Sequence, residues 1–451
     1  MKEKSMFPQR GIFRNPTMLI LAAYLAAFLL GTILLLLPIS TQSREITSPL
    51  TALFTSASAL CVTGLTTVTT AAHWSLFGQV IVLILIQLGG LGVTTAAAGL
   101  AMVLGRHISM QNRMLIAEEK NAPTPGGMAR LIRFILAATF LMEAVGAILL
   151  AIRFVPVLGW GQGVWKAVFH SISAFCNAGF DLMGTTSLSA WRSEPLVLVT
   201  IALLVILGGL GFPVYRDMMT KKRWKHFRLH TKIVLSATGI LLVSGTVLFW
   251  LLEHNNIATM GSLSLPGQWL NAFFQSTTCR TAGFSTFSQA SLTQASCLIA
   301  ITLMFVGGSP VGTAGGVKTT TMFTLLHSTR GEIGRGKKKA VYGRHLPGEL
   351  TTRASAIVLV AIIWCAIAAF IVSIAEPQVP FLDSLFEVVS AFGTVGLSRG
   401  LTSTLSVTSQ LTLIVTMLFG KIGPLTVLYA LSTKPSGTTI FKEAEESIFV
   451  G

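Results

Sequence analysis

Four short stretches of the chain share one pattern: an apolar segment runs into a small polar residue, then a glycine, then Leu or Phe. The glycines are Gly64, Gly179, Gly283 and Gly396, and they lie 115, 104 and 113 residues apart. A spacing this regular is typical of an internal repeat. We therefore interpret the chain as four copies of one unit.

These glycines could build a cation pore. Glycine adopts positive φ angles easily because it has no Cβ atom, so successive carbonyls can point inward. Inward carbonyls can replace the hydration shell of a permeating ion. The last stretch, Thr394-Val395-Gly396, matches the start of the TVGYG filter of K⁺ channels. The candidate filter residues, whose carbonyls would hold K⁺, are Val62, Thr63, Gly64, Asn177, Ala178, Gly179, Thr281, Ala282, Gly283, Thr394, Val395 and Gly396. The alternative is that the glycines only let helices approach closely.

The composition indicates a membrane protein. Of the 451 residues, 52% are hydrophobic and 11% are charged, which excludes a soluble domain with a single core. Apolar runs of about 20 residues can cross roughly 30 Å of hydrocarbon as helices. These runs are Thr17 to Pro38, Leu196 to Val214, Ile233 to Leu252, Ala354 to Ile374 and Leu411 to Leu431. We interpret the first as a retained span, because no small-residue cleavage site follows it.

The positive charge is placed as in a multi-pass protein. The net charge is +16, which on a soluble surface would suggest nucleic acid as a partner. Here apolar sequence sufficient for two spans separates successive basic segments, so we expect these segments and both termini in the cytoplasm. The basic segments are the N-terminus to Arg14, Arg106 to Arg133, Arg216 to Lys232, Arg330 to Arg353, and the tail from Lys434.

Each unit repeats one order: a span, a short helix, the glycine motif and a second span. The predicted short helices are Ser48 to Leu60, Val164 to Phe175, Gln268 to Thr278 and Phe381 to Phe392. The second spans are expected at about Ser75 to Leu104, from Leu196, from Ser291, and at Ser409 to Leu431. Each carries a glycine cluster, beginning at Gly89, Gly208, Gly307 and Gly420. A helix of about 12 residues cannot span a bilayer, so the chain must dip in and return.

Such irregular backbone is tolerated at membrane depth only inside protein or beside a water-filled path. The predicted fold class is therefore all-α integral membrane, with four tandem units around a pseudo-fourfold pore and eight transmembrane helices. The expected units are residues 1–105, 106–220, 221–330, which contains an intramembrane loop at 307–318, and 331–451.

Taken together, these features resemble the Trk, Ktr and HKT superfamily of K⁺ transporters, and most of all the bacterial KtrB/KtrD membrane subunits. The resemblance covers essentially the whole chain, from the filter motifs to the terminal Glu446 to Gly451. It implies K⁺ uptake across the bacterial plasma membrane, with Na⁺ as an activator and no covalent cofactor. It also implies a homodimer, with the tail of Lys442 to Gly451 at its interface, on a cytosolic ring of nucleotide-binding RCK-type subunits. The alternative for this tail is a frayed end. Glycine at all four filter positions resembles the K⁺-preferring branch.

The stretch from Gly307 to Lys318 is dense in glycine and contains proline, which break helices. It does not fit a phosphate-binding loop, because Val317 stands where that motif needs glycine. The resemblance implies a flexible loop that gates ion passage below the filter. The alternative is a kink packed against neighbouring helices. The expected gate residues are Gly307, Gly308, Ser309, Gly312, Gly315, Gly316 and Lys318.

Lys421 is expected midway along the last span, where a charge costs about 2.5 to 3.5 kcal/mol and should face water or the protein interior. The resembled family usually has arginine here, as a barrier in the pore. Lysine keeps the charge but lacks the planar fork of arginine. We expect Lys421 to be a second part of the gate, against the alternatives of snorkelling or a structural pair.

Other signals are weaker. Arg280, Glu143, His170, Asp181 and Glu387 lie in spans or near the predicted pore helices, where packing competes with ion tuning. The five cysteines contain no CxxC pair and are expected to be buried filler. No HExxH or GxSxG motif indicates an enzyme, and four parallel repeats favour a pore over a carrier.

Overall fold

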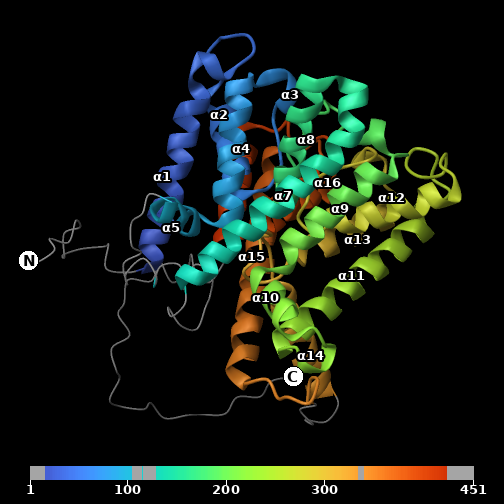
Figure 1. Ribbon diagram of the computed structural model, residues 1–451. Coiled ribbons are helices and arrows are strands. Elements are labelled where there is room, and N and C mark those ends of the chain that lie inside the picture. Colours follow the sequence, from blue (N-terminus) through green and yellow to red (C-terminus); the bar gives the residue numbers. More distant parts are fainter. Residues whose placement is uncertain (1–15, 104–113, 115–127, 334–339, 424–451) are drawn as a thin grey trace, which may run out of the picture.

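The chain folds into helices joined by loops (Figure 1). The computed structural model describes residues 16–103, 114, 128–333 and 340–423. Within these ranges no strand forms, and three isolated β-bridges join loop residues, in agreement with the expected all-helical fold. The predicted cytoplasmic N-terminus, most of the basic segment from Arg106 and the tail from Lys434 lie outside the described residues.

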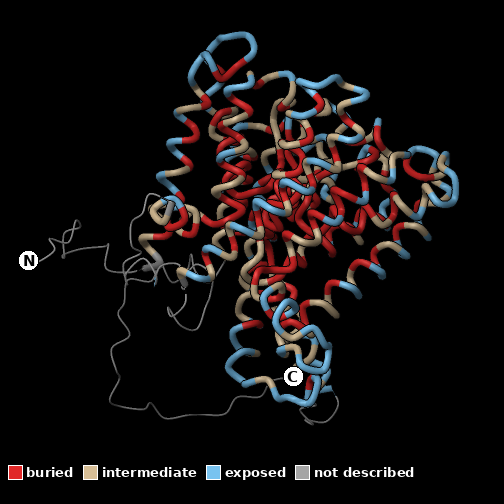
Figure 2. Tube along the Cα trace, in the orientation of Figure 1, coloured by how far each residue is buried: buried red, intermediate tan, exposed pale blue. Residues whose placement is uncertain are grey.

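Four helices in the described ranges are long and apolar enough to cross a membrane without a break. They are α1 (Pro16–Leu36), α7 (Met128–Leu158), α11 (Leu229–Glu253) and α15 (Gly348–Ala375). At 1.5 Å per residue, even the 21 residues of α1 extend over about 30 Å. Only 28–33% of each apolar window is buried within the protein. The outer faces of these helices are therefore available to lipid (Figure 2).

A short helix packs against each long one. The short helices are α2 (Pro49–Cys61), α8 (Trp160–Phe175), α12 (Leu265–Thr278) and α16 (Phe381–Gly393). Their last residues agree with the predicted ends to within one position. Proline stands in the first turn of α2 and α12. An N–H group in the first turn has no partner within the helix, so proline costs no hydrogen bond there.

Each of the first two predicted second spans is a pair of helices with a sharp bend between them. The chain bends by 99° between α4 and α5, and by 91° between α9 and α10. The bends occur at Gly92 and Gly211, whose φ angles are +86° and +88°, a region that residues with a side chain rarely adopt. The helices concerned are α4 (Leu76–Leu91), α5 (Val93–Val103), α9 (Pro195–Leu210) and α10 (Phe212–Lys221).

The two remaining second helices also end early. α13 (Gln294–Phe305) stops where a loop of residues 306–318 begins, and α14 (Thr319–Ile333) follows this loop. α17 (Val407–Ile422) ends at Gly423, with φ +98°. Lys421, which was predicted to lie midway along a span, lies in the last turn of α17. The predicted continuation to Leu431 lies outside the described residues.

The glycine clusters let second helices touch the ends of the short helices. A β-carbon would lie 1.9 Å from the carbonyl oxygen of Leu60 if built on Gly89, 1.9 Å from that of Phe175 on Gly208, and 1.8 Å from that of Phe392 on Gly420. No side chain fits at these distances. All three carbonyls belong to the residue four positions before a motif glycine, which explains why the clusters recur at similar spacing. Gly307 differs, because it packs against Gly315 of its own loop.

Two carboxylates connect long helices to second helices. Glu253 at the end of α11 accepts a hydrogen bond from the backbone N–H of Thr293, 2.9 Å away, just before α13. Glu376, just after α15, accepts from the N–H of Ser406 at 2.7 Å, just before α17. Each satisfies an amide at a helix start, where a negative charge is also favoured by the helix dipole.

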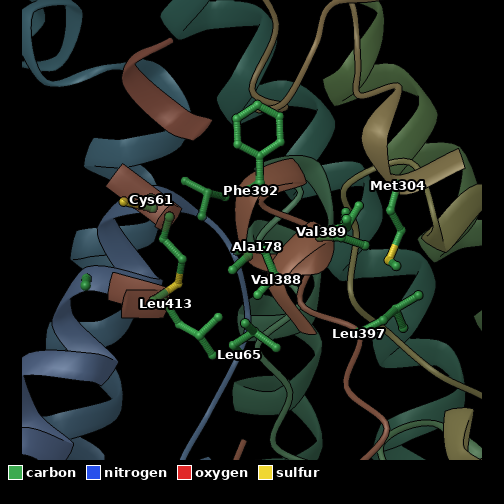
Figure 3. Packing of buried hydrophobic residues seen from close by; sticks show 14 of the residues in the cluster. Cys61, Leu65, Ala178, Met304, Val388, Val389, Phe392, Leu397 and Leu413 are labelled. Atoms are coloured by element: carbon green, nitrogen blue, oxygen red, sulfur yellow. The ribbon is translucent and has the colours of Figure 1, made fainter. Parts of the chain in front are cut away.

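A large apolar core surrounds the region where the short helices end (Figure 3). Its labelled members include Cys61 of α2, Met304 of α13, Phe392 of α16 and Leu413 of α17. Segments far apart in the sequence therefore meet in one core. All five cysteines are free and buried, which confirms their expected role as apolar filler.

We predict that Gly420→Ala lowers the thermal unfolding temperature of the detergent-solubilised protein. The added methyl group would push α17 away from α16, and overpacking of this kind costs about 1–3 kcal/mol. Gly239→Ala is the matched control, because Gly239 lies in α11 with nothing within 4 Å of the place that a β-carbon would take. The control should be as stable as the wild type or more so, since alanine favours helix. Equal stability of the two variants would contradict the close packing of α17 on α16.

Candidate functional site

The four motif glycines meet at one place in the molecule. A β-carbon would lie 2.4 Å from the carbonyl oxygen of Ala178 if built on Gly64, 2.7 Å from that of Ala282 on Gly179, 2.6 Å from that of Val395 on Gly283, and 2.1 Å from that of Thr63 on Gly396. Each segment thus touches the next, and the fourth touches the first, so the contacts close a ring. We call residues 62–64, 177–179, 281–283 and 394–396 the glycine ring.

One backbone conformation recurs in all four segments of the ring. The glycines have φ angles between +69° and +93°. The residue two positions before each glycine also has a positive φ, and these residues are Val62 (58°), Asn177 (59°), Thr281 (70°) and Thr394 (52°). Left-handed residues at alternate positions turn successive N–H groups to one side of the chain and carbonyls to the other. Each segment can therefore present a row of carbonyl oxygens.

The N–H groups of the ring are bonded back to the short helices. Amides of the residues before the glycines donate to helix carbonyls: Thr63 to Ser58 at 2.8 Å, Ala178 to Ser173 at 2.7 Å, Ala282 to Thr278 at 3.0 Å and Val395 to Ser390 at 2.8 Å. The amides of Gly64 and Gly396 donate to the hydroxyls of Ser58 and Ser390, both at 3.1 Å. With these amides engaged on the helix side, the carbonyls are left for the opposite side.

The dipoles of the short helices also act on the ring. All four end just before it, and the C-terminal end of a helix carries a partial negative charge of about half an electron, which favours a cation. The third ring segment differs, because a basic residue follows its short helix. Arg280 lies two residues beyond α12, is 7% exposed, and its Nε atom has no hydrogen-bond partner among the described residues. A buried positive charge therefore stands beside the end of this helix.

A polar cavity opens on the ring. Its volume is about 780 Å³, and its lining includes Gly64, Gly179, Gly283 and Gly396 together with threonine and serine side chains. Asp181 also lines it, held by the N–H of Met183 at 2.9 Å. We call this space the ring cavity. Its hydroxyls and the carboxylate of Asp181 can hydrate or attract a cation, and Arg192 is the one basic residue of the lining.

The donor atoms that the ring offers to a cation are backbone oxygens. In the residues that the structure describes, no three His, Cys, Asp or Glu side chains come together as a metal site would require. Carbonyl oxygens are the ligands that selectivity filters use for K⁺. The ring residues therefore fit a weakly held, passing cation.

The loop of residues 306–318 lies directly against the ring. A β-carbon on Gly315 would lie 2.3 Å from the side-chain oxygen of Thr394, and one on Gly316 would lie 3.2 Å from Gly393. The loop is fastened at its two ends, where Gly307 donates to Val317 at 2.9 Å. The side-chain hydroxyl of Ser309 lies 2.9 Å from that of Thr319. These bonds give the loop a defined shape.

Thr313 makes the contacts that hold the middle of this loop. Its N–H donates to the carbonyl of Gly208 at 3.2 Å. Its hydroxyl lies 3.2 Å from the carbonyl oxygen of Phe175 and 3.1 Å from the side-chain amide of Asn177 in the ring. Its carbonyl accepts from the ammonium group of Lys421 at 2.7 Å. The structure thus brings Lys421 and the predicted gate loop together through a residue that the sequence reasoning did not single out.

A second cavity lies on the other side of the loop. Its volume is about 530 Å³, and its lining includes Pro310 to Gly312, Gly316, Lys318 and Lys421. We call it the loop cavity. It shares no lining residue with the ring cavity. The loop and Lys421 therefore separate the glycine ring from this second space.

The remaining predicted residues are buried near the ring. Glu143 is 5% exposed and accepts from Gln87 at 3.3 Å. His170 is fully buried, with Nδ1 2.7 Å from the carbonyl of Lys166. Glu387 is fully buried and accepts from the hydroxyl of Thr402 at 3.0 Å. Each has partners within the protein, so the structure supports the packing alternative for these side chains.

Sequence reasoning also missed Arg399, whose guanidinium lies 2.6 Å from the carboxylate of Asp383. A signal was present: Asp383 and Glu387 are four residues apart on a short helix, and Arg399 follows the motif glycine by three. Carboxylates at this spacing share one helix face, and a cation nearby in the sequence is a natural partner.

The chain matches known proteins over nearly its whole length. The family model for TrkH, described as a cation transport protein, matches residues 7–441. The Ktr system potassium uptake protein B of Vibrio alginolyticus is 39% identical over 466 residues, covering 99% of this chain and 100% of the relative. The potassium/sodium uptake protein NtpJ of Enterococcus hirae is 37% identical over 442 residues, covering 97% of each.

A solved structure has the same fold. The crystal structure of the potassium transporter TrkH from Vibrio parahaemolyticus matches with a TM-score of 0.73 and 17% sequence identity. The match covers 96% of this chain and 87% of that chain.

We predict that K⁺ raises the thermal unfolding temperature of the purified wild type and that Gly283→Ala removes this effect. A ligand at 100 times its Kd stabilises by about 2.7 kcal/mol, whereas a methyl group at φ +80° would meet the carbonyl of Val395. Gly161→Ala is the control, because Gly161 has nothing within 4 Å and no positive φ. Retained K⁺ stabilisation in Gly283→Ala would show that the ion binds elsewhere.

Proposed function

Because the chain belongs to the TrkH family of cation transport proteins, we propose that it takes up potassium ions across a membrane through the glycine ring. The observation that carries this proposal is the closed contact of four glycine segments with one backbone conformation. The names of the relatives, potassium uptake protein B and potassium/sodium uptake protein, support potassium as the ion. Transport of an ion breaks no covalent bond, so the chain acts as a transporter and not as an enzyme.

In this proposal the ring is a selectivity filter. A K⁺ ion leaves its water in the ring cavity and exchanges it for backbone carbonyl oxygens. The ring residues named above supply these oxygens, and the ends of the short helices offset the charge of the ion. Asp181, in the wall of the ring cavity, raises the local concentration of cations before they enter.

The pore that we propose has four quarters and eight transmembrane helices. Its units are residues 1–105, 106–220, 221–330 and 331–451. The same order of long helix, short helix and glycine segment in each unit supports this division. The bent or interrupted second helices supply the other four crossings. The quarters differ in sequence, with Arg280 in one only, so the symmetry is approximate.

The loop of residues 306–318 and Lys421 form the gate in this proposal. The gate residues are Gly307, Gly308, Ser309, Gly312, Gly315, Gly316 and Lys318 with Lys421. Support comes from the contacts of Thr313, which join the loop to Asn177, to Gly208 and to the ammonium group of Lys421. Opening requires the loop to leave these partners, and its glycines allow the backbone to rearrange.

The basic segments would face the cytoplasm of a bacterial plasma membrane, with both termini on that side. Support comes from α10 and α14, which lie at the same end of the molecule (Figure 1). There the hydroxyl of Tyr342 lies 2.6 Å from that of Ser236, and its ring contacts Trp224 at 6.2 Å. This contact joins the basic segments around residues 216–232 and 330–353.

We further propose a homodimer that works with a cytosolic ring of nucleotide-binding RCK-type subunits and is stimulated by Na⁺. The relative in Vibrio alginolyticus is named as part of a Ktr system, and the relative in Enterococcus hirae is named for both potassium and sodium. The exposed basic residues Lys222, Arg223 and Lys225 offer a surface for a cytosolic partner or for anionic lipid.

The direct test is uptake of K⁺ or Rb⁺ by a cell that lacks its own K⁺ uptake systems. We predict uptake by the wild type, measured with and without an RCK-type subunit and with and without Na⁺. Gly64→Ser should lower it strongly, because the added side chain at φ +93° would meet the carbonyl of Ala178. Absence of uptake by the wild type under all four conditions would contradict the proposed function.

For the gate, we predict that Lys421→Met raises Rb⁺ uptake per protein at the cell surface. Methionine keeps an unbranched side chain of nearly the same length but removes the charge and the hydrogen bond to Thr313. Lys421→Arg should behave like the wild type, since it keeps a positive donor at this position. Uptake by Lys421→Met at or below the wild-type level would count against Lys421 as a barrier.

A further inference from the structure

One face of the short helix α16 holds the segment that follows Gly396. The residues of this face are Asp383, Glu387 and Ser390, which stand at helical spacings of four and three and so point the same way. Ser390 accepts from the N–H of Gly396 at 3.1 Å. This series of contacts between α16 and the segment after Gly396 therefore begins in the ring itself.

Glu387 holds the next residues. Its carboxylate is fully buried and accepts from the hydroxyl of Ser398, from the N–H of Arg399 at 3.1 Å and from the hydroxyl of Thr402 at 3.0 Å. Asp383 makes the last contact of the series, because its carboxylate accepts from the Nε atom of Arg399 at 2.6 Å. Two carboxylates on α16 thus fix both the backbone and the side chain of Arg399.

The other nitrogen atoms of Arg399 reach across to the loop after the third glycine. One donates to the carbonyl of Gln289 at 2.8 Å and the other to that of Ala290 at 3.3 Å. Gln289 is in turn paired with Gln275 of α12 by two side-chain hydrogen bonds of 2.7 and 3.2 Å. Arg399 therefore joins α16 to α12, the helices behind the fourth and third ring segments. We call Asp383, Glu387, Arg399 and Gln289 the Arg399 clamp.

The clamp has no ionic counterpart at the other described junctions. Between the first and second ring segments, the indole of Trp165 donates to Gln79 at 2.8 Å. Between the second and third, the N–H of Leu188 donates to Ser285 at 2.9 Å. Of the three ion pairs among the described residues, that of Arg399 with Asp383 is the one whose arginine also donates to the loop after another ring segment.

The clamp is also shielded from solvent. The side chains of Arg399 and Asp383 are 13% and 21% exposed. A charge-assisted hydrogen bond in such surroundings is stronger and shorter than a neutral one. Removal of the guanidinium would leave a mostly buried carboxylate and two carbonyls without their donor, so the adjoining loops would have to rearrange.

We propose that Arg399 is a positioning residue that sets the preference of the glycine ring for K⁺ over the smaller Na⁺. The inference rests on the proposed function. Gly283 and Gly396 belong to neighbouring segments, and a β-carbon on Gly283 would already lie 2.6 Å from the carbonyl of Val395. By tying the exits of these two segments together, the clamp fixes the distance between their carbonyls. A looser pair could close around Na⁺, which a rigid ring holds less well than K⁺.

The test compares Rb⁺ and Na⁺ uptake by the full chain in cells without other K⁺ uptake systems. Five variants are measured: Arg399→Gln, Arg399→Lys, Asp383→Asn, the double variant of Arg399→Gln with Asp383→Asn, and Arg153→Gln. The last is the matched control, because Arg153 of α7 also pairs with a carboxylate, Glu194 at the start of α9, but within one unit and with a side chain 41% exposed. Surface amount and unfolding temperature are recorded for each variant.

We expect Arg399→Gln and Asp383→Asn to lower the ratio of Rb⁺ to Na⁺ uptake severalfold, and the double variant to change it no further, since the two residues act as one unit. Arg399→Lys should give an intermediate ratio, because lysine can pair with Asp383 but cannot also bridge the two carbonyls. Arg153→Gln should keep the wild-type ratio. A purely structural role would reduce the uptake of both ions and leave the ratio unchanged.

An unchanged ratio in a clamp variant that reaches the membrane would overturn the inference. If Arg399→Gln fails to fold, Arg399→Lys decides, because it retains the charge, and a wild-type ratio in that variant equally overturns it. Failure of the proposed function is a distinct result, since the wild type would then show no Rb⁺ uptake at all.

Discussion

The structure depends on one constraint: irregular backbone inside a membrane must find its hydrogen bonds within the protein. Four such segments meet at the glycine ring. Their N–H groups are taken by the ends of α2, α8, α12 and α16, and their glycines leave no room for a β-carbon beside the next carbonyl. With the amides engaged in this way, the carbonyl oxygens remain for a cation. In the proposed filter, the hydrogen bonds that satisfy the ring amides therefore also leave the carbonyl oxygens available to the ion.

The second helices follow from this arrangement. Gly89, Gly208 and Gly420 let α4, α9 and α17 lie against the last turns of the short helices. The chain then bends at Gly92 and Gly211, and α17 ends at Gly423. In the third quarter, α13 gives way to the loop that carries Thr313. The same glycine signal therefore produces a packed helix in three places and a loop in the fourth. The loop of residues 306–318, which replaces the packed helix in the third quarter, lies between the ring and the loop cavity.

The sequence predicted where the short helices and glycine segments lie, but not how the chain turns after them. Short helices and glycine segments could be predicted because apolar periodicity and glycine are local signals, and the ends of the helices agree to within one residue. The bends at Gly92 and Gly211 could not, since a glycine within an apolar run is compatible with a straight helix or a turn until its neighbours are known. Thr313 and Arg399 act through partners more than 100 residues away, and a single sequence carries no record of such pairs.

If the glycine ring is a filter, its backbone must hold a cation. Anomalous X-ray diffraction from crystals grown in Rb⁺ can locate such an ion, because Rb⁺ is a close substitute for K⁺ and its position is found without reference to the protein. We expect an anomalous peak enclosed by the carbonyls of Thr63, Ala178, Ala282 and Val395. A peak confined to acidic side chains, or a ring with no peak at saturating Rb⁺, would contradict binding by the backbone.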